Sequence, residues 1–395
     1  MSAGACHPRG FTAGTASCGM YPQQRDDLAL LVSQPPAAAA GVFTTNRFAA
    51  APVLVSREQL AGGSAQAVVT NAGVANACTG RQGVEDAWAM VAATAEAASV
   101  APQRVLVAST GVIGQPLPIG AVVEGIAGAG RCQAAGNGRR AAEAIRTTDA
   151  FAKLGQATVE LSGGSVRIGG MAKGAGMIRP DMATTLAQLT TDADVAAADL
   201  ARVLGEVADA SFNRISVDGC TSTNDCIFLL ANGASGVAAI SGRDLELLRA
   251  ALSRLALDLA TMVVRDGEGT TRVCTYLVTG AADDAAARAA ARAVADNVLV
   301  KCALHGADPN WGRILAALGA SGAALDPERV RVAVGGVAVV EAGAGVAGCE
   351  AAAARAMSQD EVEVELSLGI GEGTASAIGS DLSPAYVSFN AGATS

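Results

Sequence analysis

Residues 171–186 read MAKGAGMIRPDMATTL and place a lysine among glycines shortly before a pair of threonines. Lys173 can set an ammonium group against a ligand carboxylate, because the flanking glycines let the backbone approach closely. Thr184 follows eleven residues later, but a threonine hydroxyl is a poor nucleophile unless a base takes its proton. The sequence offers no Ser-His-Asp spacing, and no histidine lies nearby.

A threonine that becomes a chain N-terminus can use its own amine as the base. Such an α-amino group has a pKa of about 7.7 to 8.0, which suits proton transfer at neutral pH. Here it would require cleavage of the Ala183–Thr184 bond, and the small Ala183 side chain would let the Thr184 hydroxyl reach the preceding carbonyl. The residues alone leave a second interpretation open, which is an ordinary threonine-rich start of a helix.

Two other short motifs bear on chemistry. The apolar run VLVAS at 105–109 ends in Thr110 and Gly111, which could present a hydroxyl and a backbone N–H to one oxygen, as an oxyanion hole requires. By themselves these residues favour an ordinary turn. GAGVAG at 343–348 fits GxGxxG, but only 47 residues follow it, too few for a dinucleotide domain. The sequence therefore predicts no organic cofactor.

Composition excludes several classes of protein. The formal charge of -9 offers no broad basic field, so nucleic acid is not an expected partner. The chain shows no signal-peptide pattern and no stretch of about 20 apolar residues, so we expect a cytoplasmic protein without a membrane span. Nine cysteines without a CxxC pair predict free thiols, and two histidines make a His-rich metal site unexpected.

Hydrophobic patterning predicts a mixed α/β (α+β) protein. Short apolar runs at 66–70, 104–108 and 272–280 are typical of buried strands, and helical spacing appears at 84–98, 244–264 and 283–299. From about residue 328, two segments of alternating residues enclose a helical one. They indicate a small C-terminal αβ subdomain, which we place from about 282 to 395.

The motifs together resemble the ornithine acetyltransferase family of arginine biosynthesis, also called glutamate N-acetyltransferase. They keep the family's order from about residue 10 to the end of the chain, which makes chance agreement implausible. They are GFTAGTASCGM, GVFTTNRFAAAPV, VVTNAGVANACTG, STGVIGQPLP, AIRTTD, GGMAKGAGMIRPDMATTLAQLTTDA, FNRISVDGCTSTND, VRDGEGTT, ADPNWGRILAALG and SDLSPAYVSFN.

The resemblance implies a layered sandwich like that of the N-terminal nucleophile hydrolases, cut into residues 1–183 and 184–395. It implies that Thr184 is the nucleophile and new N-terminus, Ala183 the other new end, and Thr110 with Gly111 the oxyanion hole. The substrate-binding positions that it implies are Thr147, Lys173, Thr184, Glu268, Asn390 and Ser395.

The implied reaction moves an acetyl group from N-acetylornithine to glutamate through an acetyl-enzyme, with no metal or cofactor. The implied assembly is an α2β2 heterotetramer of the two cleaved chains. Three alternatives stay open: acetyl-CoA as a further donor, a role in secondary metabolism, and a non-catalytic amino-acid-binding relative.

This chain departs from the family pattern at two places. The tail NAGATS puts Ala393 where the family commonly has a tyrosine and Ser395 where it has a threonine, and NAGVANA at 71–77 replaces the usual NSGNANA. Both departures bear on substrate preference. Thr185 could also serve as the new N-terminus in place of Thr184, although the Met-Ala that precedes the cut favours Thr184.

Overall fold

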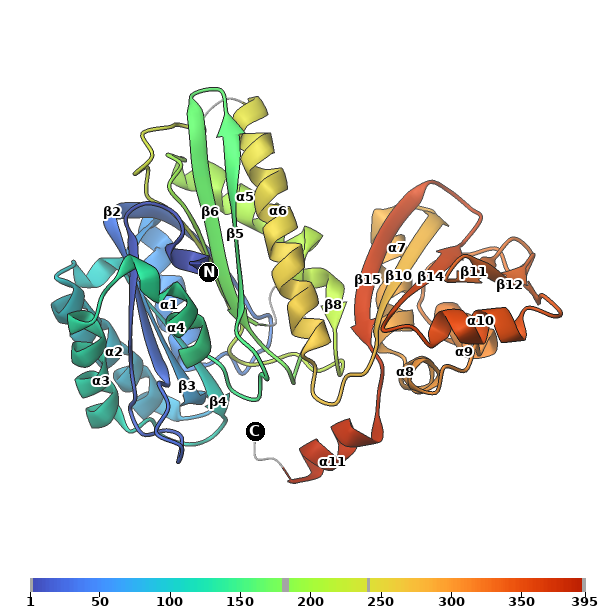
Figure 1. The fold of residues 1–395 in the computed structure, drawn as a ribbon, viewed down its shortest axis with the longest axis horizontal. Helices are drawn as coiled ribbons and strands as arrows, with labels where there is room; N and C mark the ends of the chain where they lie inside the picture. Colours follow the sequence, from blue (N-terminus) through green and yellow to red (C-terminus); the bar gives the residue numbers. More distant parts are fainter. Residues whose placement is uncertain (1–2, 180–184, 240–241, 393–395) are drawn as a thin grey trace.

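The protein consists of two lobes, each built on one β-sheet, with the last helix extending from the second lobe back beneath the first (Figure 1). The structure is a computed structural model and describes residues 3–179, 185–239 and 242–392. The mixed α/β class predicted from the sequence is confirmed. Among the described residues, no helix is both long and apolar enough to cross a membrane.

The first lobe contains an eight-stranded sheet with the order β4-β3-β2-β9-β7-β6-β5, and β1 pairs with β2 outside this path. Its strands are β1 (Phe11–Ala16), β2 (Leu28–Phe43), β3 (Ser64–Val74), β4 (Val105–Val112), β5 (Lys153–Leu161), β6 (Gly164–Lys173), β7 (Leu186–Thr191) and β9 (Cys226–Ala231). Its helices are α1 (Ala51–Gln59), α2 (Gly80–Ala98), α3 (Ile119–Arg131), α4 (Gly138–Ala144), α5 (Ala197–Ala210) and α6 (Gly242–Arg265).

Helices cover both faces of this sheet, which explains why its strands bury side chains on both faces. One core lies between α2, α3 and strands β2 to β4, and another lies beneath α5 and α6 against β5, β6, β7 and β9. All six side chains of β7 and of β9 are buried. The sheet therefore provides a rigid support for groups at its strand ends.

The second lobe contains a seven-stranded sheet with the order β13-β12-β11-β14-β10-β15-β8. Its strands are β8 (Ile215–Ser216), β10 (Val273–Ala281), β11 (Arg331–Val334), β12 (Val337–Glu341), β13 (Ala344–Gly345), β14 (Glu361–Ser367) and β15 (Gly373–Ser380). Its helices are α7 (Asp284–Asp296), α8 (Val298–His305), α9 (Trp311–Gly319) and α10 (Glu350–Met357), and α11 (Pro384–Gly392) follows. The subdomain predicted from the sequence starts at about residue 282. The sheet of this lobe also includes β8 and β10, which precede that residue.

The strands predicted at 66–70, 104–108 and 272–280 are confirmed as β3, β4 and β10. The single helix predicted over 283–299 is wrong, because α7 ends at Asp296 and α8 begins at Val298. Asn297 between them has an extended backbone, and its side chain accepts hydrogen bonds from Leu299 N and Val300 N. The asparagine thus caps a new helix instead of continuing the old one.

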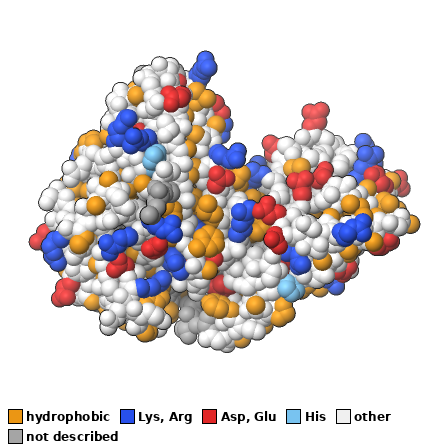
Figure 2. All heavy atoms as spheres, in the orientation of Figure 1, with side chains coloured by type: hydrophobic (Ala, Val, Ile, Leu, Met, Phe, Trp, Pro, Cys, Tyr) orange, Lys and Arg blue, Asp and Glu red, His pale blue; other side chains and the backbone are white. Residues whose placement is uncertain are grey.

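On the face of the molecule shown in Figure 2, lysine and arginine side chains alternate with aspartate and glutamate side chains over both lobes. Apolar side chains are scattered singly among them. This distribution suits a protein that binds its ligand inside a cavity, because that face has no large patch of one charge.

Candidate active site

A cavity of about 410 Å³ lies where several strand ends of the first lobe meet the loops beside them. Its lining includes Thr110, Gly111, Thr147, Lys173, Glu268 and Asn390, which are six of the positions implied by the family resemblance. These residues come from β4, the loop before β5, the end of β6, the turn after α6, and α11. The fold thus brings together groups that lie up to 280 residues apart in the chain.

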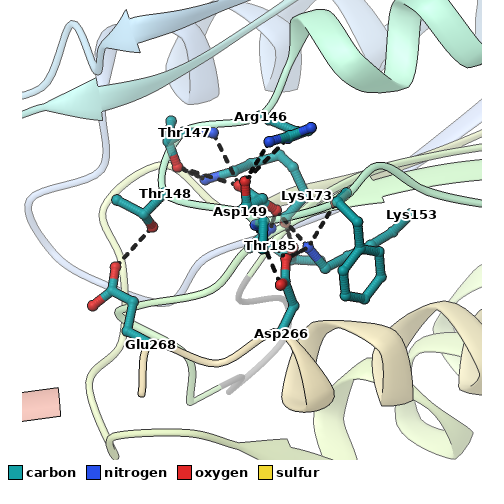
Figure 3. A network of polar contacts seen from close by, with 12 residues as sticks. Arg146, Thr147, Thr148, Asp149, Lys153, Lys173, Thr185, Asp266 and Glu268 are labelled. Carbon is teal, nitrogen blue, oxygen red and sulfur yellow. Dashed lines mark hydrogen bonds and ion pairs between the residues drawn. The ribbon is translucent and has the colours of Figure 1, made fainter. Parts of the chain in front are cut away.

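Lys173 ends β6 with its ammonium group buried in the cavity wall, and the residue is 8% exposed. Its Nζ donates a hydrogen bond to Thr147 Oγ1 at 2.8 Å (Figure 3). It donates another to Thr110 Oγ1 at 3.0 Å. Burial lowers the pKa of Lys173, while the carboxylate of Asp149 acts in the opposite direction. A ligand carboxylate placed here would meet a cation with little competing water.

Asp149 organises the polar groups behind Lys173 (Figure 3). Its Oδ1 accepts from Lys153 Nζ and from Gly174 N, each at 2.7 Å, and its Oδ2 accepts from Thr147 N at 2.9 Å. Burial by itself would raise the pKa of Asp149, but Lys173 and Lys153 lower it below its usual range. The carboxylate therefore stays charged and fixes the loop and strand end that carry Thr147 and Lys173.

Lys153 lies between two carboxylates. Its Nζ is 2.7 Å from Asp149 Oδ1 and 2.5 Å from Asp266 Oδ2, and its side chain is 0% exposed. Asp266 immediately follows α6, so this ion-pair cluster joins β5 to the turn that carries Glu268. Sequence reasoning missed this cluster, because no local spacing pairs residues that are 113 positions apart.

Thr110 and Gly111 lie near the end of β4, where the pairing with β3 shifts its register, and they belong to the strand and not to an ordinary turn. Gly111 has φ +132°, and a Cβ there would come within 2.2 Å of the Gly73 carbonyl carbon, so only glycine fits. The Thr110 hydroxyl accepts from Lys173 and so keeps its own hydrogen available as a donor. This end of β4 can supply both donors that an oxyanion hole needs.

Glu268 contributes a carboxylate to the lining of the cavity. Its Oε1 accepts from Thr148 Oγ1 at 2.7 Å, and its Oε2 accepts from Asn390 Nδ2 at 2.9 Å. A Cβ at Gly176 would come within 2.6 Å of each carboxylate oxygen, so the backbone there is pressed against this group. Two charged groups of opposite sign, Lys173 and Glu268, thus line one cavity.

Asn224 and Asp218 hold the loops of the cavity in place. Asn224 Nδ2 donates to Ala75 O at 2.6 Å and to Ser109 O at 2.8 Å, which fixes the approach to Thr110 and Gly111. Asp218 accepts from Met177 N at 2.6 Å and from Ile178 N at 2.9 Å. No sequence pattern indicated a role for Asp218, because that role depends on a tertiary contact with a loop about 40 residues away.

The expected cleavage residues Ala183 and Thr184, and the terminal Ser395, lie outside the described residues. Thr185, the next residue, lines the cavity, and its hydroxyl donates to the Lys173 carbonyl oxygen. Strand β7 begins immediately afterwards, at Leu186. The interpretation of this stretch as the start of a helix is therefore wrong.

The described residues contain no group of three or more His, Cys, Asp or Glu side chains that could hold a metal ion. The chemically useful groups of the cavity are hydroxyls, ammonium groups, carboxylates and backbone N–H groups. They suit acyl transfer, which needs a nucleophile, a base and an oxyanion site.

Comparison with known proteins places this chain in a family. The ArgJ family model matches residues 12–395. This chain belongs to the ArgJ family. A relative from Symbiobacterium thermophilum, named arginine biosynthesis bifunctional protein ArgJ, is 48% identical over 347 residues, covering 87% of this chain and 86% of the relative. A protein of the same name from Dehalococcoides mccartyi is 45% identical over 388 residues, covering 97% and 95%.

A crystal structure of arginine biosynthesis bifunctional protein argJ from Bacillus halodurans is 37% identical and superimposes with a TM-score of 0.51. The superposition covers 52% of this chain and 98% of the Bacillus halodurans chain. The resemblance drawn from the sequence motifs is thereby confirmed, and this ArgJ protein is an acetyltransferase of arginine biosynthesis.

Proposed function

We propose that this ArgJ protein cleaves itself between Ala183 and Thr184 and then transfers an acetyl group from N-acetylornithine to glutamate. The observation that carries the proposal is the buried contact of Lys173 with the hydroxyls of Thr110 and Thr147, in a cavity that Thr185 also lines. The cavity thus contains a cation suited to a substrate carboxylate, the proposed oxyanion donors of Thr110 and Gly111, and the residue next to Thr184.

In the first half-reaction, the Thr184 hydroxyl attacks the acetyl carbonyl of N-acetylornithine while the Thr184 α-amine takes the hydroxyl proton. Negative charge develops on the carbonyl oxygen, and the Thr110 hydroxyl and the Gly111 N–H stabilise it. The C–N bond then breaks, the α-amine returns the proton to the departing nitrogen, and ornithine leaves. Thr184 now carries the acetyl group as an ester.

In the second half-reaction, the neutral amine of glutamate attacks this ester, the bond from the acetyl carbon to Thr184 Oγ breaks, and the Thr184 α-amine carries a proton from the nitrogen to Oγ. Lys173 is suited to pair with the α-carboxylate that both amino acids share, and Glu268 with the side-chain ammonium of ornithine. Since the two substrates react with the same acetyl-enzyme in turn, the kinetics should be ping-pong.

The half-length Bacillus halodurans chain supports the cleavage step. It matches 52% of this chain with 98% of its own residues, and that is the length expected for one product of a cut near the middle. We further propose an α2β2 heterotetramer of the two products in the cytoplasm, to be tested by native mass.

The word "bifunctional" in the relatives' names favours a second activity on the same site. We propose acetyl-CoA as an additional donor that forms the same acetyl-Thr184, which glutamate then accepts. Release of free CoA thiol upon addition of glutamate and acetyl-CoA, with no acetylornithine present, measures this activity directly.

The test of the main proposal is the denatured mass of the purified protein beside the variants Thr184→Ala and Thr185→Ala. We expect two fragments from the parent and from Thr185→Ala, and one intact chain from Thr184→Ala. The cut parent should then release ornithine from N-acetylornithine and gain one acetyl group in mass on residues 184–395. An intact parent, or a cut parent that never gains the acetyl group, would refute the proposal.

A further inference from the structure

Asp225 is a buried acidic residue of the cavity that the proposed chemistry has not yet used. It lines the cavity immediately before β9, and it is 4% exposed. Its Oδ2 has no hydrogen-bond partner within the described part of the chain. Buried polar atoms nearly always have a partner, so an unpaired carboxyl oxygen in a cavity wall points to a ligand group that binds it.

The chain neighbours of Asp225 connect it to both halves of the proposed catalytic machinery. Cys226 N donates to Thr185 O at 3.2 Å, which ties this side of β9 to the residue after Thr184. Asn224 Nδ2 donates to Ser109 O at 2.8 Å, which ties it to the residue before Thr110. Asp225 thus lies between the segments that carry Thr185 and Thr110, which suits it to contact the nitrogen of an acetyl group bound between them.

The surroundings suit a carboxyl group that gains and loses a proton. Burial raises the pKa of Asp225 well above its usual value, while Ser222, through hydrogen bonds, and Lys173, through its charge, act in the opposite direction. Lys173 faces it from β6, and Cys226, whose own pKa is raised by burial and by Asp225, follows it on β9. Such a carboxyl holds its proton more tightly than an exposed aspartic acid does, so it can give a proton to a departing amine.

We propose that Asp225 binds the α-amino nitrogen of the substrates and carries the proton that ornithine gains and glutamate loses. This inference rests on the proposed function and extends it. When the C–N bond breaks, the α-nitrogen of ornithine is a neutral amine, and ornithine is released from the enzyme with this nitrogen as an ammonium ion. Protonated Asp225 gives it that additional proton and becomes a carboxylate. Glutamate arrives as an ammonium ion, and the carboxylate takes one proton from it.

The glutamate amine then forms the bond to the acetyl carbon, the ester bond to Thr184 Oγ breaks, and the second proton of the nitrogen passes through the Thr184 amine to Oγ. Atoms and protons balance over the full cycle, because Asp225 ends in the protonated form in which it began. No proton exchange with solvent is needed between the two half-reactions.

The test uses the cut, acetylated enzyme with two acceptors. Glutamate enters as an ammonium ion, whereas hydroxylamine is largely uncharged at neutral pH and needs no proton acceptor before it attacks. For Asp225→Asn we expect kcat/KM with glutamate to fall by roughly 30-fold or more, the loss typical of removing one partner of a buried charge pair. Transfer to hydroxylamine should stay within about threefold of the parent.

Asp192→Asn is the matched control for loss of a buried carboxylate, because Asp192 is 0% exposed and binds Arg167 N at 2.7 Å outside the cavity lining. In this control, the ratio of the acetyl-transfer rate to glutamate over the rate to hydroxylamine should equal that of the parent. If Asp225→Asn transfers the acetyl group to glutamate as fast as the parent, or if its transfer rates to both acceptors fall equally, the proposal is wrong. An uncut but folded Asp225→Asn would assign the residue to maturation and also overturn it.

Ser222→Ala provides an independent readout should Asp225→Asn fail to fold. It removes the hydrogen bond that lowers the pKa of Asp225, so this pKa should rise further. The acceptor step needs ionised Asp225, and its rate with glutamate should therefore begin to rise at higher pH than in the parent. An unmoved pH profile would count against the proposal. A parent that never forms an acetyl-enzyme would instead refute the proposed function itself.

Discussion

Replacement of Lys173 by methionine separates the chemical role of this buried ammonium from any structural one. Methionine keeps most of the side-chain volume but removes the charge and the hydrogen bonds to Thr110 and Thr147. A hydrogen bond that involves a charged group contributes about 1.5 to 3 kcal/mol. If Lys173 binds the substrate carboxylate, kcat/KM for N-acetylornithine should fall by roughly 10- to 150-fold.

The free energy of unfolding should change far less, because two effects of the substitution oppose each other. The variant loses two hydrogen bonds and one of the two charges that lower the pKa of Asp149, although Asp149 keeps its ion pair with Lys153. It also no longer has to bury the charge whose desolvation lowers the pKa of Lys173. We expect a change within about 1 kcal/mol, which for a protein of this size corresponds to a shift in Tm of no more than about 4 °C.

The assay normalises the rate of ornithine release to the fraction of enzyme that is cut, as measured by denatured mass, and compares it with Tm. In the parent, the lowered pKa of Lys173 predicts that substrate binding weakens as pH rises, at pH values below those at which a free lysine loses its proton. Parent-like kcat/KM in Lys173→Met, or loss of folding with no separate loss of activity, would refute the assignment.

Three further substitutions test other parts of the site. Thr110→Val should lower the single-turnover rate of ornithine release by about 10²- to 10³-fold, because it removes a hydroxyl that donates to the developing oxyanion; an unchanged rate would remove Thr110 from the oxyanion hole. Glu268→Gln should raise KM for N-acetylornithine roughly tenfold with little effect on glutamate, since only ornithine has a side-chain ammonium; equal effects on both substrates in steady-state assays would contradict this pairing. Lys153→Met should lower stability by about 3 to 5 kcal/mol in denaturant unfolding, because it leaves Asp149 and Asp266 buried without their shared cation; a loss below about 1 kcal/mol would show that the cluster is not a structural support.

Local patterns predicted the elements of the fold well, because both sheets are built from apolar or alternating segments with clear boundaries. The strand β4 and the helix α6 follow directly from such patterns. The break at Asn297 was missed, since helical spacing continues across it and only the capping asparagine marks the new start.

The candidate site was predicted in part, for a different reason. Lys173 and the Thr110–Gly111 pair carry recognisable local chemistry, and the family resemblance supplied the distant Glu268 and Asn390. The supports of the site, namely Lys153 with its two carboxylates and Asp218 with its backbone partners, arise from contacts between distant segments. No spacing within one segment can reveal them, because their pairing exists only after the sheet has formed.

The order of strands in the first sheet has a consequence for the proposed cut. Strands β7 and β9 lie after residue 184, yet they are inserted between β2 and β6, which lie before it. The products of cleavage would therefore remain interwoven in a shared hydrogen-bond ladder and could part only by unfolding. Maturation then has to follow folding of the intact chain, and the mature enzyme should migrate as one particle although a denaturing gel resolves two polypeptides.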